Sequence, residues 1–204
     1  LLPKIGWLLF SATAFIFLFP IIKEKLSQAD KVSAFGIELQ LSKKIEIYNK
    51  NSKDADSLKI PYENKTQIIN RVKLLDTFLT SRTHKILWVD DNPVNNIYVK
   101  QILEQIGFKI DNAGSTNSAL ALIDATLADT SLHNYDLIIS DYSRDDTLHD
   151  TDGKVFANSA SKLIPTTPII FFSSSYNETK EGIPESIYAV AHRADYLINF
   201  VLDV

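Results

Sequence analysis

Acidic side chains follow two apolar segments of the sequence, and together they could hold a divalent cation. Asp90 and Asp91 come directly after the run ILWV, and Asp141 comes directly after DLIIS. Adjacent carboxylates repel one another, and they are costly to bury without a counter-charge. Their hard oxygen atoms are ligands that magnesium prefers. The three residues predict a magnesium site if the fold brings the two segments together; otherwise they are solvated strand ends, one of which caps the next helix.

The segment that carries these aspartates alternates apolar strands with helices. We expect strands at residues 85–90, 108–112, 135–140, 168–172 and 187–191. We expect helices from Pro93 to about Ile106, from Ser115, from Gly153 to Ile164 and from Tyr196 to Val204. Fully apolar strands that alternate with helices are typical of a parallel sheet with helices on both faces. The predicted fold class is therefore α/β, with a doubly wound, parallel five-stranded sheet.

The strand order decides whether the aspartates meet. In the flavodoxin-like order 2-1-3-4-5, the first and third strands are neighbours, about 4.8 Å apart. Asp90, Asp91 and Asp141 then lie together at the carboxyl edge of the sheet, where open sheets of this kind bind their ligands. Ser173, in the segment PIIFFSS, ends the neighbouring fourth strand.

With these residues in place, the segment from about Lys85 to Val204 resembles the receiver domain of bacterial response regulators. The resemblance implies two-component signal transduction in which the acidic pair and a nearby backbone carbonyl bind Mg²⁺, and a strand-end aspartate accepts a phosphoryl group. It also implies a histidine kinase or a downstream effector as protein partner, with a homodimer as a further candidate. The residues that match these roles are Asp90 and Asp91 for the metal, Asp141 as metal ligand and phosphoacceptor, Ser143 for the carbonyl, and Ser173 for contact with the phosphoryl group.

Two features depart from the receiver pattern. Receiver domains carry a lysine after the fifth strand, whereas this sequence reads YAVAHRADYL, with His192 and Arg193 nearest to that position. The loop after Asp141, YSRDDTLHDTDG, is longer than usual and lacks the expected Met-Pro. Two alternatives therefore stand beside phosphotransfer: an interaction scaffold of the same fold, or a magnesium-dependent phosphohydrolase, for which no second acid or substrate cap is evident.

The composition excludes several other classes of function. The net charge is −4, and no DNA-binding domain is recognisable, so we expect no nucleic-acid partner. The chain has no cysteine, which excludes disulfides, thiolate zinc sites and cysteine nucleophiles.

The first 22 residues predict a transmembrane anchor. No ionisable group occurs from Ile5 to Ile22, and these residues would span roughly 27 Å as a helix, about one hydrocarbon core. Lys23 and Lys25 follow, which favours a cytoplasmic position for the C-terminal domain of a single-pass membrane protein. A secretory signal peptide and a buried core helix are the rival interpretations, although KEKLSQAD offers no convincing cleavage site.

Residues 23–60 are predicted to form a juxtamembrane strand and a linker. Apolar residues alternate with polar or small ones from Phe35 to Leu41, which is a strand pattern. The polar stretch NKNSKDADSLK that follows indicates a loop.

Residues 61–82 are predicted to form an amphipathic helix, because their apolar residues recur at spacings of three and four. Such a stripe packs on its own domain or pairs with a second copy, and we favour a spacer or dimerising helix. The receiver-like domain is placed at residues 85–204.

Overall fold

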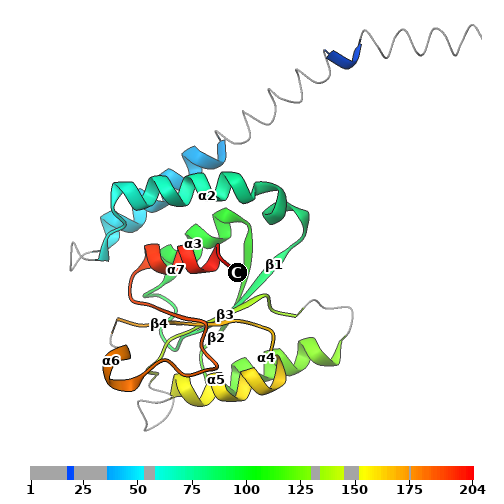
Figure 1. The fold of residues 1–204 in the computed structure, drawn as a ribbon, viewed down its shortest axis with the longest axis vertical. Coiled ribbons are helices and arrows are strands. Elements are labelled where there is room, and N and C mark those ends of the chain that lie inside the picture. Colours follow the sequence, from blue (N-terminus) through cyan, green and yellow to red (C-terminus); the bar gives the residue numbers. More distant parts are fainter. Residues whose placement is uncertain (1–17, 21–35, 53–57, 130–133, 145–151, 175) are drawn as a thin grey trace, which may run out of the picture. The chain divides into compact units, whose positions relative to one another are not determined.

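The computed structural model of the chain describes residues 18–20, 36–52, 58–129, 134–144, 152–174 and 176–204 (Figure 1). Contacts between residues divide the chain into two units, Leu1–Leu39 and Gln40–Val204. Within the first unit, residues 18–20 and 36–39 are helical. The second unit contains the acidic residues, so it is the part whose fold positions the site. The predicted division of the chain into residues 1–22, 23–60, 61–82 and 85–204 remains a prediction.

The second unit is built on a five-stranded parallel sheet. Its strands are β1 (His84–Val89), β2 (Phe108–Ala113), β3 (Leu137–Ser140), β4 (Ile169–Phe172) and β5 (Ala189–Ala191). They lie in the order β2-β1-β3-β4-β5, and every neighbouring pair is parallel. β1 and β3 are buried along nearly their whole length, as central strands covered on both faces must be. The α/β class and the flavodoxin-like strand order are thus confirmed.

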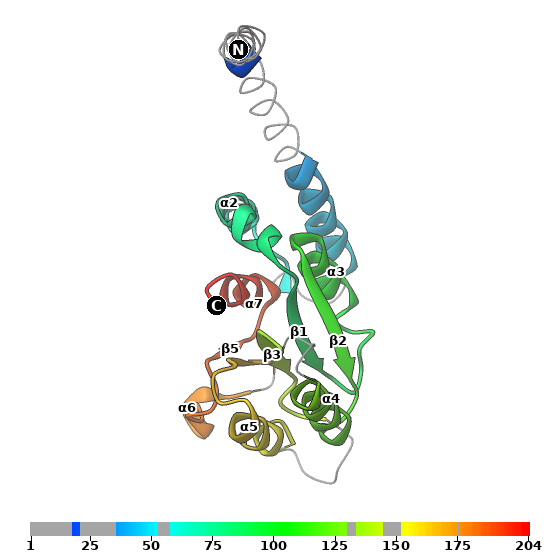
Figure 2. The same ribbon diagram turned by 90° about the vertical axis from the view of Figure 1, so that its right-hand side faces the viewer.

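Helices cover both faces of this sheet (Figure 2). They are α2 (Tyr62–Ser81), α3 (Ile97–Ile106), α4 (Thr116–Ala128), α5 (Asp152–Leu163), α6 (Glu178–Glu181) and α7 (Ala194–Val201). One face carries α3 and α7, and the opposite face carries α4 and α5. Strand side chains alternate between the faces, so Leu87 and Val89 of β1 pack in one core with Phe156 and Ala157 of α5.

Residues 36–51 form a helix, so the strand predicted from Phe35 to Leu41 is wrong. The predicted loop also begins too early, because residues 49–51 continue the helix. Alternation over a few positions fits either structure, and a longer window with four-residue spacing decides between them. Leu41 and Ile45 have this spacing, and both side chains are buried.

The predicted amphipathic helix is present as α2, and its apolar stripe packs within its own chain. Ile68 and Val72 are buried, and α2 lies against α7. Arg71 of α2 reinforces this contact, because its Nη1 donates to Asn199 Oδ1 at 2.9 Å and its Nη2 lies 2.5 Å from Asp203 Oδ1. The spacer or dimerising role favoured for this stripe is therefore corrected to intramolecular packing.

The predicted single-pass membrane location is wrong. Among the residues that the structure describes, no helix is both long and apolar enough to cross a membrane. Of the predicted anchor, only residues 18–20 are described as helical, and residues 1–17 and 21–22 lie outside the described residues. The cytoplasmic placement of the C-terminal domain rested on that anchor and is withdrawn with it.

Candidate functional site

The carboxyl ends of β1 and β3 bring the three predicted acidic residues together. Val89 pairs with Ser140 across the two strands, and the backbone N–H of Asp141 donates to Val89 O at 2.9 Å. As a result, ligand oxygen atoms of Asp90, Asp91 and Asp141 lie within 4.8 Å of one another. A set of carboxylate oxygens this close together suits a hard divalent cation such as magnesium.

We call the cluster of Asp90, Asp91 and Asp141 the acidic edge. Asp90 is its buried member. Its Oδ1 accepts the backbone N–H of Asn92, and its Oδ2 accepts the side-chain amide of Asn96, both at 2.8 Å. The turns that make these hydrogen bonds delay the start of α3 to Ile97, four residues after the start predicted at Pro93. The local chain is therefore folded around the Asp90 carboxylate.

The Asp141 carboxyl group is partly buried, and its pKa is raised. Burial is the main cause, and the charges of Asp90 and Asp91 add to it. The backbone N–H groups of Tyr142, at 2.6 Å from Oδ1, and of Ser143 act in the opposite direction by hydrogen bonding to the carboxylate. A cation at the acidic edge would favour the charged form of Asp141.

The backbone that carries Asp141 is confined by the first turn of α5. A Cβ atom added to Gly153 would lie 2.7 Å from Tyr142 O and 2.9 Å from Asp141 O, closer than real Cβ atoms approach such atoms. The N–H of Gly153 donates to Tyr142 O at 3.0 Å. Glycine thus permits a close approach of α5 that fixes the chain on either side of the acidic side chain.

Ser143 and Ser173, the other predicted site residues, lie beside Asp141 and line the same cavity. Ser173 is buried directly after β4, and its backbone N–H donates to Ala191 O at 3.1 Å. The metal contact of the Ser143 carbonyl and the phosphoryl contact of the Ser173 hydroxyl remain predictions.

Lys100, a buried cation near the acidic edge, was missed by the sequence analysis. Its Nζ donates to Asn112 Oδ1 at 2.7 Å and lies 4.8 Å from the centre of the Trp88 ring. Burial lowers the pKa of Lys100, and the charge of Asp90 opposes this shift. The available signal was helical spacing, because Lys100 lies four residues after Asn96, whose side-chain amide donates to Asp90.

Arg144 is a second buried cation that the sequence analysis missed. Its Nη1 donates to Ser140 Oγ and to Asp141 O, each at 2.8 Å, and its Nη2 donates to Thr116 Oγ1 at 2.8 Å. These partners come from two separate segments, so no local pattern in the sequence indicates this arrangement. Arg144 ties the loop after β3 to the start of α4.

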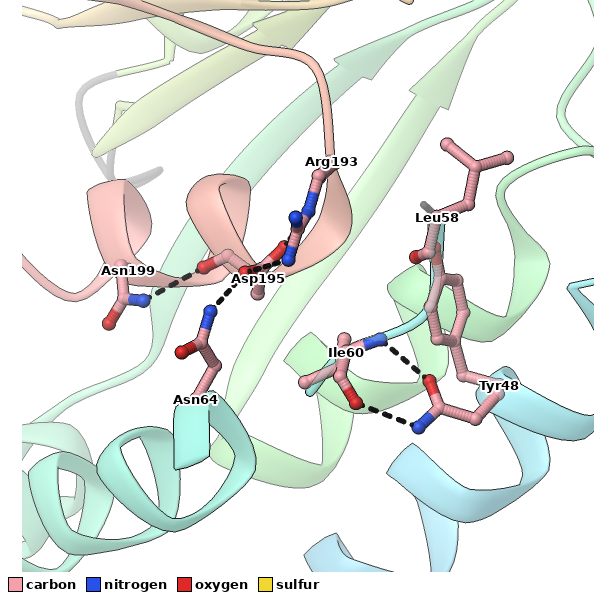
Figure 3. A network of polar contacts seen from close by, with 8 residues as sticks. Tyr48, Leu58, Ile60, Asn64, Arg193, Asp195 and Asn199 are labelled. Atoms are coloured by element: carbon pink, nitrogen blue, oxygen red, sulfur yellow. Dashed lines mark hydrogen bonds and ion pairs between the residues drawn. The ribbon is translucent and has the colours of Figure 1, made fainter. Parts of the chain in front are cut away.

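The two basic side chains nearest to the end of β5 are engaged with partners other than Asp141. Arg193 donates to both oxygens of Asp195, from Nε at 3.0 Å and from Nη2 at 2.8 Å. Asp195 is fully buried and also accepts the Asn64 amide of α2 (Figure 3). His192 Nδ1 lies 2.7 Å from Ser173 O, which only accepts hydrogen bonds, so the imidazole is the donor. Neither side chain is placed as a direct counterpart of the lysine in the receiver pattern.

Solved receiver structures are similar to this chain. The chemotaxis response regulator CheY4 of Vibrio cholerae is 19% identical over 60% of this chain and 98% of that chain, with a TM-score of 0.48. A CheY-like receiver domain protein of Methanospirillum hungatei is 22% identical over 60% of this chain and 95% of that chain, with a TM-score of 0.45. The response regulator TrrA of Thermotoga maritima, solved in complex with Mg²⁺-BeF, is 22% identical over 59% of this chain and 98% of that chain, with a TM-score of 0.47.

No family model matches the chain, and no curated protein matches it. The identities and TM-scores of the similar structures are low, so the geometry of the acidic edge is the basis for a functional proposal.

Proposed function

We propose that the chain is a signalling protein whose receiver-like domain accepts a phosphoryl group on Asp141, with Mg²⁺ held by Asp90, Asp91 and Asp141. The observation that carries this proposal is the convergence of the three carboxylates within 4.8 Å at the carboxyl edge of the sheet. The backbone carbonyl of Ser143 would add a metal ligand, and the hydroxyl of Ser173 would contact the transferred group.

The chemistry assigned to Asp141 is nucleophilic attack of a carboxylate oxygen on phosphorus. A bond forms between that oxygen and phosphorus while the donor's bond to phosphorus breaks, and the leaving group keeps the electron pair. The N–H groups of Tyr142 and Ser143 orient the carboxylate for this attack. Bound magnesium would supply screening of the repulsion between carboxylate and phosphate. A histidine kinase is the proposed protein donor, and a downstream effector or a second copy of the chain would respond to the modified state.

A second candidate function is an interaction scaffold of the same fold without phosphotransfer. The observation that favours it is the engagement of Arg193 with Asp195 and of His192 with Ser173 O. Pairing with the buried Asp195 reduces the charge that Arg193 can offer to a phosphoryl group, so charge developing on that group would be less stabilised.

Intact mass measurement after incubation with phosphoramidate and Mg²⁺ tests the proposal. We expect one phosphoryl adduct on the wild-type chain and none on Asp141→Asn. The matched control is Asp124→Asn, which changes an exposed aspartate of α4 and should keep the adduct. Asp90→Asn should weaken magnesium binding at least about tenfold, since even outer-shell partners of metal ligands are worth that much.

The remaining outcomes separate the alternatives. Absence of both the adduct and magnesium binding would support the scaffold. Steady turnover of a phosphate ester, in place of a single adduct, would support a phosphohydrolase. An adduct that persists in Asp141→Asn would contradict the assignment of the nucleophile.

A further inference from the structure

The cavity beside Asp141 has a wall that comes from outside the α/β sheet. Its volume is about 580 Å³, within the range of about 300 to 1,000 Å³ that is typical of small-molecule sites. Its lining includes Asp141, Ser173 and Arg193 from the ends of strands or just after them, and Tyr48 and Leu58 from an earlier part of the chain. These last two residues precede the receiver-like segment, so the wall is an addition to that fold.

The wall is held in place by hydrogen bonds of its own. Tyr48 Oη donates to Leu58 O at 3.0 Å. The side-chain amide of Asn49 binds the backbone of Ile60 twice, donating to its carbonyl at 2.9 Å and accepting its N–H at 2.8 Å (Figure 3). Ile60 is itself buried. These hydrogen bonds join the residues around Tyr48 to those around Leu58.

The lining of the cavity combines two kinds of chemistry. The guanidinium of Arg193, held in place by Asp195, and the hydroxyl of Ser173 lie on the same lining as Asp141. A fixed guanidinium and a hydroxyl are suited to the oxygen atoms of a phosphoryl group. Tyr48 and Leu58 offer an aromatic ring and an aliphatic side chain, which are suited to a flat organic group. The same lining thus offers contacts both to an anionic group and to an organic body.

We propose that this cavity binds a small organic phosphate, with its phosphoryl group toward Asp141 and Arg193 and its organic part against Tyr48 and Leu58. The inference rests on the proposed function for the position of the phosphoryl group. It adds the chemical class of the remainder of the ligand, which the acidic edge alone does not specify.

Calorimetric titration of the full chain with two probes tests this inference. With Mg²⁺ present, we expect phenyl phosphate to bind at least about tenfold more tightly than inorganic phosphate, because only phenyl phosphate places an apolar ring against the wall. Leu58→Glu should remove this advantage, because the ring would then bury against an ionised group. Both probes are anions, so the carboxylate introduced by Leu58→Glu would repel both of them. The ratio of the affinity for phenyl phosphate to the affinity for inorganic phosphate is therefore the quantity to compare. The matched control is Leu74→Glu, at an exposed position of α2, which should keep the wild-type ratio.

Equal affinities of the two probes for the wild type, or an unchanged ratio in Leu58→Glu, would overturn the inference. Magnesium titration of the same samples separates this failure from failure of the proposed function. If magnesium does not bind while the preference for phenyl phosphate persists, the proposed function falls and the cavity site stands. If magnesium binds and the adduct forms on Asp141 without any such preference, only the cavity site falls.

Discussion

Burial and two neighbouring carboxylates raise the pKa of Asp141, so its charged form opposes folding when no cation is bound. A raised pKa in the folded state means that the folded protein binds this proton more tightly than the unfolded chain does. The free energy of unfolding therefore falls as pH rises from the ordinary pKa of aspartate through the raised pKa of Asp141. At pH values above the raised pKa of Asp141, the free energy of unfolding has lost the whole of this contribution.

The substitution Asp141→Asn should therefore stabilise the protein at pH 7 when divalent cations are removed. We expect the free energy of unfolding to rise by on the order of 1 kcal/mol, the repulsion of like charges about 4 Å apart in water-like surroundings. Urea denaturation with a chelator present measures this change. Below the ordinary pKa of aspartate the difference should vanish, because the carboxyl groups are then protonated in both states. Asp124→Asn should change little at either pH, and a less stable Asp141→Asn at pH 7 would contradict the argument.

The sequence predicts the acidic residues of the site better than its cations. Asp90 and Asp141 could be placed because each directly follows an apolar strand, and parallel strands end at one edge of the sheet. The contacts of Lys100 with Asn112 and of Arg144 with Thr116 could not be placed in this way, because they join separate segments that only the packed fold brings together. The contact of Asn64 with Asp195 could not be foreseen for a similar reason, since Asn64 comes from a helix much earlier in the chain.

At the scale of elements, the polar contacts between α2 and α7 include one to a buried carboxylate and one to an exposed carboxylate. Asp195, fully buried in the first turn of α7, accepts hydrogen bonds from Arg193 and from Asn64 of α2. Asp203, just after α7, pairs with Arg71 of α2 at 2.5 Å, and its side chain is 47% exposed. The two carboxylates thus join the same helices in very different surroundings.

Asp195→Ala should cost about 3 kcal/mol of unfolding free energy, because it leaves the Arg193 guanidinium and the Asn64 amide without their carboxylate. Asp203→Ala is the matched control and should cost at most about 1 kcal/mol, as expected for an exposed ion pair. Urea denaturation of the two variants under identical conditions makes the comparison. Similar costs for both substitutions would show that the burial of Asp195 does not govern this contact.

Boundaries and types of elements differ in how well the sequence predicts them. The five strands of the sheet and Gly107, whose φ of 119° ends α3, follow from local patterns that tertiary packing reinforces. The segment from Phe35 to Leu41 was misassigned because its alternation is shorter than two helical turns. Four-residue spacing becomes visible only when the window extends to Ile45.

At the scale of the whole molecule, the second unit extends beyond the receiver-like segment to Gln40. Lys44 Nζ donates to Gln101 Oε1 of α3 at 3.2 Å, and Gln105 Nε2 of α3 donates to Gln40 Oε1 at 2.9 Å. Sequence periodicity identifies elements, but it does not say which surface of a sheet an upstream helix will cover. The added helix matters for the proposed site because it continues into the residues that form the cavity wall.

Leu41→Ala tests whether this helix folds as one unit with the sheet. Leu41 is 1% exposed, so its truncation should lower the free energy of unfolding by about 3 kcal/mol through lost burial and a residual cavity. The matched control is Leu39→Ala, two residues earlier in the helical stretch and 61% exposed, which should change stability by less than about 0.5 kcal/mol. Fluorescence of the buried Trp88, measured in a Trp7→Phe background, reports on the sheet during urea denaturation. A shift of the Trp88 transition in Leu41→Ala alone would establish the coupling, whereas an unshifted transition would mean that the helix can detach while the sheet stays folded.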